Sequence, residues 1–265
     1  MLVRATPRTD KAGELPAGRH SVRRRLLIGV VMLSIAVLIV LGLHAVDNRT
    51  SDEDLRFVRR FVPGIEPLPE DRTFADEMAL IMAVQHAVLA RAPGDDGIPF
   101  DRPREPKDLY QAGSGLCYDR SRTIEKALRY ARLRTRHVAF FAIGQDGSAL
   151  RALLTSGVPS HAVTEVRTRR GWLVVDSNDP WVSIDAEGKP RSMRDIRSAA
   201  EGQSRIHWQR PPPADIYNEP LVFVYGLYSR HGRFYPPFGP IPDIHYGELL
   251  GNLLPAGPSD ARQPR

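Results

Sequence analysis

The sequence has very little cysteine, with one residue, Cys117, in a chain of 265. A single thiol excludes a disulfide within the chain, a Cys-x-x-Cys redox pair and a zinc site built from several thiolates. The eight histidines and the acidic residues also lack the spacing of metal ligands. We therefore expect no metal and no other cofactor. A lone cysteine is either a small, inert hydrophobic residue or a reactive thiol.

The chain also has almost no net charge outside its first 25 residues. The whole chain carries +6, but residues 1–25 hold seven basic and two acidic residues, and the other 240 hold 30 basic and 29 acidic. A folded nucleic-acid-binding domain thereby loses its main electrostatic support. We expect no nucleic-acid partner, and we interpret residues 1–25 as a short basic tail.

One long apolar run follows this tail directly. Residues 26–43 read LLIGVVMLSIAVLIVLGL, eighteen residues without a charge. As a helix this run is about 27 Å long, close to the ~30 Å hydrocarbon core of a bilayer. It lacks the polar face of a soluble amphipathic helix. We predict one transmembrane helix over residues 26–46, and a cleaved signal peptide is the alternative.

The charges that flank this run predict its orientation. Arg23, Arg24 and Arg25 adjoin its N-terminal end, whereas the mixed stretch DNRTSDEDLR follows it. Basic residues next to a span favour the cytoplasmic side. We therefore predict a single-pass protein of the inner (plasma) membrane, with a cytoplasmic N-terminus and a periplasmic or other extracytoplasmic domain.

The remaining chain divides by composition. Residues 47–70 are polar and include PGIEPLPED, which predicts a juxtamembrane stalk with a short helix over 53–61. Residues 71–200 are the predicted folded domain. Residues 201–254 are rich in proline and aromatic residues, so we expect an irregular extension packed over the domain, and residues 255–265 read as a disordered tail.

Residue spacing within 71–200 predicts two helices followed by three strands. The first helix begins at the capping box Thr73 to Asp76 and continues to Leu89, and the second covers about Leu116 to Ala131. The intervening stretch 91–107 reads as a surface loop. The predicted strands are 137–143, 161–167 and 172–176. Helices followed by consecutive strands indicate an α+β fold with an antiparallel sheet.

Cys117 lies at the predicted N-terminal end of the second helix, directly after Gly113-Ser-Gly115. Unpaired backbone N–H groups and the positive end of the helix dipole favour a thiolate at this position. Gly115 leaves room for an acyl substrate to approach the backbone, and the Cys117 N–H is a candidate oxyanion donor. An inert cysteine would instead lie inside the helix on its apolar face. The position therefore favours a nucleophile.

A thiol nucleophile needs a base that takes its proton and an acceptor that orients the base. His161 and Asp176 lie on the second and third predicted strands, which form a candidate hairpin. A loop centred on Thr168 and Arg169 would set His161 directly opposite Asp176. Because Thr-Arg is a poor two-residue turn, we expect a four-residue loop or a bulge. Cys117, His161 and Asp176 are the candidate triad.

Two stretches of the sequence carry a pattern that resembles a known family. They read GSGLCYDRSRTIEKALRYARLRTRHV and SHAVTEVRTRRGWLVVDSNDPW, and the resemblance covers roughly residues 105–182. The pattern resembles the transglutaminase-like superfamily of papain-fold enzymes. In that family Gly-x-Cys begins a helix, an xxRxV strand follows, a histidine begins the next strand and an aspartate ends the one after. The matching residues are Gly115 with Cys117, Arg136 with Val138, His161 with Glu165 and Val166, and Trp172 with Asp176.

The resemblance implies a papain-like core, in which a helix that carries Cys117 packs on an antiparallel sheet. It also implies that Cys117 is the nucleophile, that His161 acts as general base and then acid, and that Asp176 orients His161. Tyr118 stands where animal transglutaminases have tryptophan, and no calcium-site pattern is present. Cross-linking of the animal kind is therefore not implied. Bacterial relatives include proteases, amidases and envelope proteins without an assigned activity.

Further residues are candidates for supporting the nucleophile. Gln111 lies six residues before Cys117, a spacing similar to that of the oxyanion glutamine in papain-type proteases. Tyr110 is the rival for this role. We also predict a structural ion pair between Asp119 and Arg136 near the site.

Together, the residues and the resemblance predict a membrane-anchored cysteine enzyme of the cell envelope. It would act on an amide or other acyl group of a protein or peptide substrate through a thioester. Hydrolysis, as a protease or amidase, and acyl transfer are both open. The alternative is a catalytically silent envelope scaffold or binding protein, because a fold does not fix a function.

Overall fold

A computed structural model describes residues 18–94, 96–99, 102–143, 147–148, 151–152, 155, 157–228 and 243–252, with side chains from residue 23 onward. The chain forms two compact units, one that ends at Leu43 and one that begins at His44. Residues 1–17 of the predicted basic tail and the predicted disordered tail 255–265 lie outside the described residues.

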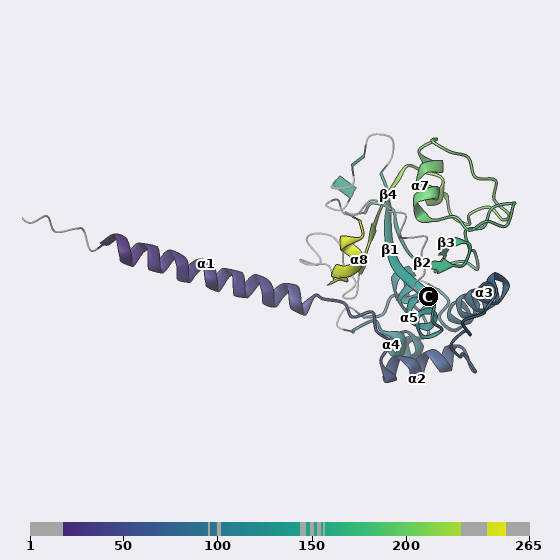
Figure 1. The fold of residues 1–265 in the computed structure, drawn as a ribbon, viewed down its shortest axis with the longest axis horizontal. Helices are drawn as coiled ribbons and strands as arrows, with labels where there is room; N and C mark the ends of the chain where they lie inside the picture. Colours follow the sequence, from purple (N-terminus) through teal and green to yellow (C-terminus); the bar gives the residue numbers. More distant parts are fainter. Residues whose placement is uncertain are drawn as a thin grey trace, which may run out of the picture. The chain divides into compact units, whose positions relative to one another are not determined.

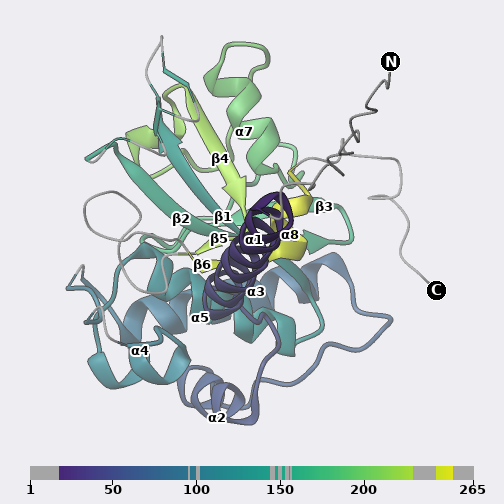
Figure 2. The same cartoon turned by 90° about the vertical axis from the view of Figure 1, so that its left-hand side faces the viewer.

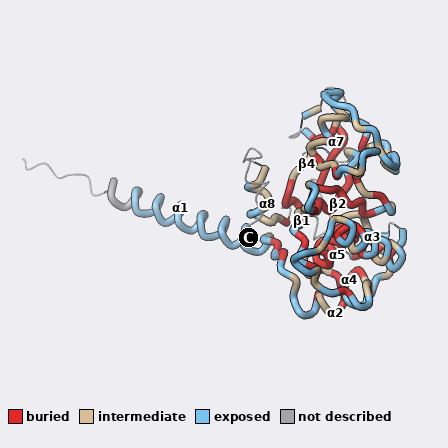
Figure 3. Tube along the Cα trace, turned by 45° about the vertical axis from the view of Figure 1, so that its right-hand side comes forward, coloured by how far each residue is buried: buried red, intermediate tan, exposed pale blue. Residues whose placement is uncertain are grey.

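The first unit is a single apolar helix, α1 (Gly18–Leu43). Its segment Arg23–Leu43 is long and apolar enough to cross a membrane, and it is exposed over most of its length (Figure 3). Leu33, for example, is 67% exposed. The helix ends three residues before the predicted end at residue 46. Ala45 instead forms a β-bridge to Ile244 within the second unit, in which the Val46 N–H donates to the Ile244 carbonyl and the Ile244 N–H donates to the His44 carbonyl.

The second unit is built on a four-stranded antiparallel sheet in the order β3-β2-β1-β4. The strands are β1 (Arg134–Ala142), β2 (Ser160–Thr168), β3 (Gly171–Val175) and β4 (Leu221–Tyr225). Strands β5 (Leu227–Tyr228) and β6 (Asp243–Ile244) form a separate antiparallel pair. The predicted α+β class with an antiparallel sheet is confirmed.

Helices cover both faces of the sheet (Figures 1 and 2). They are α2 (Asp52–Phe61), α3 (Phe74–Arg91), α4 (Pro106–Ala112), α5 (Cys117–Tyr130), α7 (Met193–Ala200), α8 (Tyr246–Leu250) and the 3-10 turn η1 (Asp215–Tyr217). The first core cluster joins α2, α3, α4 and α5 to Val166, Leu173 and Val175 on one sheet face. The second joins α7, η1 and Trp181 to Val138 and Val163 on the other face.

Two segments outside the predicted domain are part of this core. In α2, Phe57, Val58 and Phe61 are buried, so the segment expected to be a stalk packs against α4 and α5. In the segment expected to be an irregular extension, Leu221 to Tyr225 form β4 and pair with β1. Both segments supply apolar residues with a helix or strand period, which the composition of their surroundings obscures.

The β2–β3 hairpin has a different register from the predicted one. The ladder pairs Thr164 with Val175 and continues to Thr168 opposite Gly171, so only two residues form the turn. Gly171 has a φ of 144°, which glycine adopts without the steric cost of a side chain. Asp176 therefore lies two positions from the place opposite His161. A shift of two keeps both residues on one face, so they remain diagonal neighbours.

Candidate functional site

Cys117 is the first residue of α5, as the Gly-rich turn before it predicts. The Asp119 carboxylate accepts a hydrogen bond of 2.9 Å from the Leu116 N–H and closes the helix start. The Cys117 side chain is half-buried and forms no disulfide. Its backbone N–H belongs to the first turn of the helix, where N–H groups have no acceptor within the helix. The thiol therefore lies at an open, electropositive helix end.

The position of Gly115, two residues before Cys117, has no room for a larger residue. A Cβ atom at this position would overlap the Leu109 side chain and lie 3.1 Å from the Asp119 Cβ. Its carbonyl accepts a hydrogen bond from Arg120. The glycine therefore allows the turn before Cys117 to pack tightly against α4.

His161 and Asp176 form a buried pair. The His161 Nε2 and Asp176 Oδ2 atoms are 3.0 Å apart, and the two side chains are 8% and 1% exposed. Asp176 follows the last residue of β3, and His161 is the second residue of β2. Diagonal neighbours on one face of a sheet are about 7–8 Å apart, a distance that an imidazole ring and a carboxylate together can span.

Four hydrogen bonds fix the Asp176 carboxylate. Oδ1 accepts from the backbone N–H groups of Asn178, at 2.6 Å, and Asp179, at 2.8 Å. Oδ2 accepts from His161 and from the Tyr217 hydroxyl, at 2.5 Å. Burial opposes ionisation, but the His161 ring, Tyr217 and the Asn178 N–H outweigh it and hold the pKa of Asp176 below its usual value. Asp176 is therefore a fixed anion.

The surroundings of His161 strongly favour its charged form. Burial lowers the pKa of this ring, but the charge and hydrogen bond of Asp176 and the hydrogen bond and charge of Cys117 raise it to about 10. The same carboxylate and thiol, together with burial, raise the pKa of Tyr217 well above its usual value. At neutral pH His161 is an imidazolium and Tyr217 is a neutral hydrogen-bond donor.

The end of the sheet brings Cys117 to His161. His161 lies opposite Phe140 on the face that packs on Tyr217, with ring centroids 5.5 Å and 6.1 Å away. Helix α5 packs on the other face, where Ser121 Oγ lies 3.0 Å from Thr164 Oγ1. Because β3 pairs with β2 only from Thr164 onward, the His161 end of β2 extends past β3. At this uncovered end of β2, Cys117 at the start of α5 reaches His161, although His161 lies on the sheet face opposite to α5.

Arg120 joins the loop before Cys117 to the turn after Asp176. Its Nε atom donates to the Ser177 carbonyl at 2.5 Å, and Nη2 donates to Asn178 Oδ1 at 2.5 Å. Nη1 donates to the carbonyls of Gly115, Gly94 and Ala92, the last at 3.2 Å. The guanidinium is buried, so these bonds exchange little with water.

Gln85 holds the same turn from the other side. Its side-chain amide donates to the backbone carbonyls of Asp176, Asp179 and Trp181 at 2.7–3.0 Å. Arg120, Gln85 and Tyr217 are support residues that our sequence reasoning missed. Each contacts residues more than 40 positions away in the chain, so no local pattern marks it.

The structure places the predicted supporting residues unequally. Tyr110 packs its ring against Phe57 and Phe61 of α2, at centroid distances of 5.8 Å and 5.2 Å, which is a core position. Gln111 is exposed near the end of α4. An oxyanion role for either residue stays a prediction.

The predicted ion pair between Asp119 and Arg136 does not form. Asp119 pairs with Arg104 at 2.7 Å, and Arg136 on β1 pairs with Glu165 on β2 at 2.6 Å. Arg136 and Glu165 lie directly opposite each other in the ladder, which makes them cross-strand partners. Burial raises the pKa of Asp119 above its usual value, although Arg104 and the Leu116 N–H oppose this.

A scan against models of protein families finds no match for this chain, and a search of curated proteins finds none. Within the described part of the chain, no three or more histidine, cysteine, aspartate or glutamate side chains are grouped to hold a metal ion. The chemistry of the site therefore has to be inferred from its own geometry.

Proposed function

We propose that this chain is a membrane-anchored, transglutaminase-like cysteine enzyme that cleaves or transfers an acyl group through a thioester on Cys117. One observation carries the proposal: a buried His161–Asp176 hydrogen bond of 3.0 Å beside a half-buried thiol at a helix N-terminus. The sequence resemblance to the transglutaminase-like superfamily, and the papain-like core that it implies, support the same assignment.

In the proposed resting state, Cys117 is a thiolate and His161 is an imidazolium. The positive ring and the N-terminus of α5 both stabilise a negative sulfur. Asp176 binds His161 Nε2, so Nδ1 is the ring atom that exchanges a proton with the substrate. Asp176 fixes the ring orientation and stabilises its charge without taking the proton itself.

The reaction then proceeds in two halves. The Cys117 sulfur attacks the acyl carbon and forms a C–S bond, and the carbonyl electrons move to oxygen. As the oxygen returns its electrons, the C–N bond breaks, the amine takes the proton from His161, and a thioester remains. Water or a second amine next attacks this thioester and gives a proton to His161. The C–S bond breaks, and the thiolate and imidazolium are restored.

The oxyanion of each tetrahedral intermediate needs hydrogen-bond donors. The Cys117 N–H is suited to this because it lies in the first turn of α5, where N–H groups have no acceptor within the helix. Gln111 remains the proposed second donor, after a movement of its exposed side chain.

We further infer that α1 anchors the domain in the plasma membrane, with Arg23 to Arg25 on the cytoplasmic side. The domain would then lie in the cell envelope, where a protein or peptide supplies the acyl group. An unpaired cysteine in that compartment fits a catalytic use better than a structural one.

Acylation of the full chain by p-nitrophenyl acetate tests the proposal. We expect nitrophenolate release and one acetyl group on Cys117, detected by peptide mass spectrometry, with none in Cys117→Ala. His161→Ala should slow acylation at least about 100-fold, the usual scale of a lost acid or base. His86→Ala, which removes an exposed histidine of α3, is the matched control and should react like the natural chain. A folded chain that never acylates Cys117 would overturn the proposal and favour the silent scaffold.

A further inference from the structure

The domain has a surface of arginines at the end of the sheet remote from the candidate site, and one of them, Arg169, donates a hydrogen bond of 2.8 Å to the Glu70 carbonyl. We call it the arginine surface, and its members are Arg132, Arg134, Arg167, Arg169 and Arg170. Arg167 is half-buried and the other four are exposed. Among the described residues, no acidic side chain forms an ion pair with any of the five.

The strand register concentrates these charges. Arg134 lies directly opposite Arg167 in the β1–β2 ladder, and like charges in this position repel. Trp172 offsets part of this cost, because both guanidinium groups lie within 6 Å of its ring. Arg170 similarly lies 4.5 Å from the Phe74 ring centroid. Aromatic contacts hold the cations in place without neutralising them, so a bound anion would relieve the repulsion.

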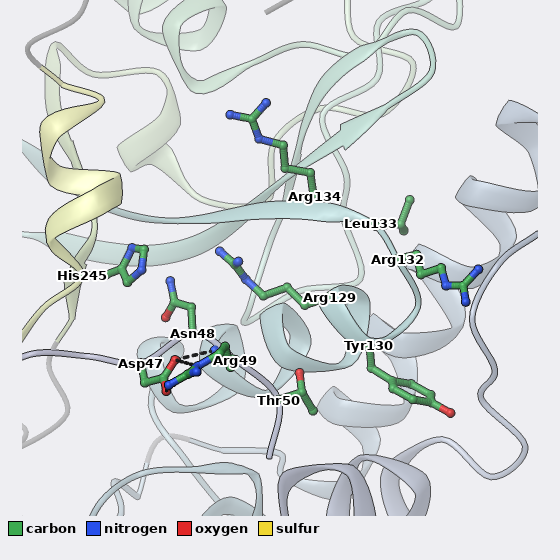
Figure 4. Close-up of a pocket in the computed structure, with 10 residues that line it drawn as sticks. All are labelled: Asp47, Asn48, Arg49, Thr50, Arg129, Tyr130, Arg132, Leu133, Arg134 and His245. Carbon is green, nitrogen blue, oxygen red and sulfur yellow. Dashed lines mark hydrogen bonds and ion pairs between the residues drawn. The ribbon is translucent and has the colours of Figure 1, made fainter. Parts of the chain in front are cut away.

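An open pocket of about 600 Å³ adjoins the arginine surface (Figure 4). Arg132 and Arg134 line it on one side, and the Asp47–Arg49 ion pair lies on the other. Arg129 projects between them but is already compensated by Glu125 and Glu248. The free positive charge is therefore spread along a face and does not converge on one point. A face of this kind fits many anionic groups side by side better than a single small anion.

The chain sequence favours one source of such groups. The pocket residues Asp47 to Thr50 follow the last residue of α1 by only four to seven positions. If α1 spans a membrane, this short connection keeps them near the lipid headgroups. Cationic side chains that lie within a screening length of anionic lipid headgroups are attracted to them on either side of a membrane. We propose that the arginine surface binds the phosphate headgroups of anionic phospholipids in the membrane that α1 crosses.

This binding would set the position of the candidate site. Cys117 and Arg132 lie at opposite ends of α5, which has 14 residues and so a length of about 20 Å. His161 and Arg167 lie at opposite ends of β2, about 20 Å apart at the rise of a strand. Two separate elements therefore hold the thiol and the imidazole about 20 Å from the arginine surface. The site would then act on substrate away from the lipid surface. The inference does not depend on the proposed catalysis.

Arginine footprinting tests the proposal with the full chain in lipid nanodiscs. Phenylglyoxal modifies accessible arginines, and peptide mass spectrometry gives a rate for each. In discs with phosphatidylglycerol, Arg134, Arg167 and Arg170 should react at least threefold more slowly than in discs of phosphatidylcholine alone. Arg205, exposed and outside the arginine surface, is the internal reference and should not change. Raising the salt to 1 M, where the screening length is about 3 Å, should remove the protection.

A variant makes the test specific. Arg132→Gln with Arg134→Gln and Arg170→Gln should abolish the protection of Arg167, whereas Lys189→Gln with Arg197→Gln and Arg210→Gln, which keeps the reference Arg205, should leave it intact. If Arg134, Arg167 and Arg170 of the natural chain reacted at the same rate in discs with phosphatidylglycerol and in discs of phosphatidylcholine alone, the result would overturn the proposal. Protection by inorganic phosphate over phosphatidylcholine discs, equal to that by phosphatidylglycerol, would also overturn it and indicate a site for soluble anions.

Discussion

Two buried polar clusters meet on α5 and differ in what they leave open. The first, at the start of the helix, contains Cys117, His161, Asp176 and Tyr217. The second, along the side of the helix, contains Arg122, Glu125, Arg129, Tyr228 and Glu248. Most side chains of both clusters are buried, but only the first includes the candidate nucleophile and base.

The second cluster is balanced and closed. Glu125 contacts Arg129 at 3.0 Å and the Tyr228 hydroxyl at 2.9 Å, and Arg122 at 3.6 Å. Burial and the charge of Glu125 raise the pKa of Glu248, although the His137 N–H and Arg129 oppose this. In the first cluster, one imidazolium faces a fixed carboxylate and a thiol that is half-exposed. We therefore interpret the charges of the second cluster as structural and those of the first cluster as part of the proposed reactive site.

The second cluster also holds the segment that follows α1. Arg122 donates to the Asn48 side chain and to the Asp47 carbonyl, both at 2.6 Å, and Lys126 pairs with Asp54 at 2.5 Å. The residues that we expected to be a stalk are thus bound to the helix that carries Cys117. The comparison predicts that changes in the first cluster remove reactivity and changes in the second remove stability.

Replacement of the nucleophile should give the largest effect. Cys117→Ala is expected to abolish acylation to the detection limit, since no other thiol is present. Its melting temperature should stay within a few degrees of the natural chain, because the side chain is small and half-buried. Acylation activity that persists in Cys117→Ala would contradict the proposal that the first cluster is the reactive one.

Asp176→Asn should lower the acylation rate by about 10³–10⁴-fold, because the amide favours the wrong ring tautomer. The variant also tests linkage. In the natural chain, the raised pKa of His161 stabilises the fold fully below about pH 6.5, and this contribution is lost as the pH rises through about 10. Denaturant unfolding between pH 6 and 10 should show this loss in the natural chain and little of it in Asp176→Asn. If the free energy of unfolding changed with pH equally in the natural chain and in Asp176→Asn, the result would contradict the ion pair between His161 and Asp176.

Arg122→Met should act in the opposite way. Removal of one partner from a buried ion pair costs about 3–5 kcal/mol, and here Glu125 and Glu105 each lose one of two counter-charges, so we expect a loss near the lower end of that range. Urea unfolding should show this loss, whereas the fraction that stays folded should acylate at close to the natural rate. A stable variant with impaired acylation would place Arg122 in the catalytic cluster.

Tyr217→Phe should have the smallest effect of these four variants. It removes the 2.5 Å hydrogen bond to Asp176 Oδ2 but keeps the ring contacts with Phe140 and Trp181. A lost bond to a charged group costs about 1.5–3 kcal/mol, so we expect acylation to be slower by roughly 10- to 100-fold and the pH profile to shift. Tyr225→Phe, which changes another buried tyrosine, should leave the profile unchanged.

Local signals in the sequence were enough to predict much of this molecule. Helix α5, strands β1 to β3 and the meeting of His161 with Asp176 follow from periodicity, a Gly-rich turn and a two-residue strand period. The register was wrong by two because Arg169 and Arg170 form a tight turn before Gly171. The predicted contact between His161 and Asp176 still forms, because a register shift of two residues keeps both side chains on the same face of the sheet.

Other features depend on contacts between distant residues. Tyr217 lies 41 positions from Asp176, and no spacing rule connects them. The charged side of α5 resembles a solvated face, and only the fold covers it with residues 47–54, Tyr228 and Glu248. Strand β4 was hidden among prolines and aromatic residues. Long-range packing, rather than local preference, determines these parts.

Alkylation of Cys117 by iodoacetamide across pH 5–10 tests the central claim most directly. The account predicts that the natural chain already reacts fast near pH 6, since the His161 imidazolium stabilises the thiolate, and that the rate changes again only as that ring loses its proton near pH 10. In His161→Gln, the rate should instead rise with ordinary thiol ionisation near pH ~8.5. A natural chain whose rate rises only near that pH, unchanged by His161→Gln, would contradict the assignment of Cys117 as an activated nucleophile.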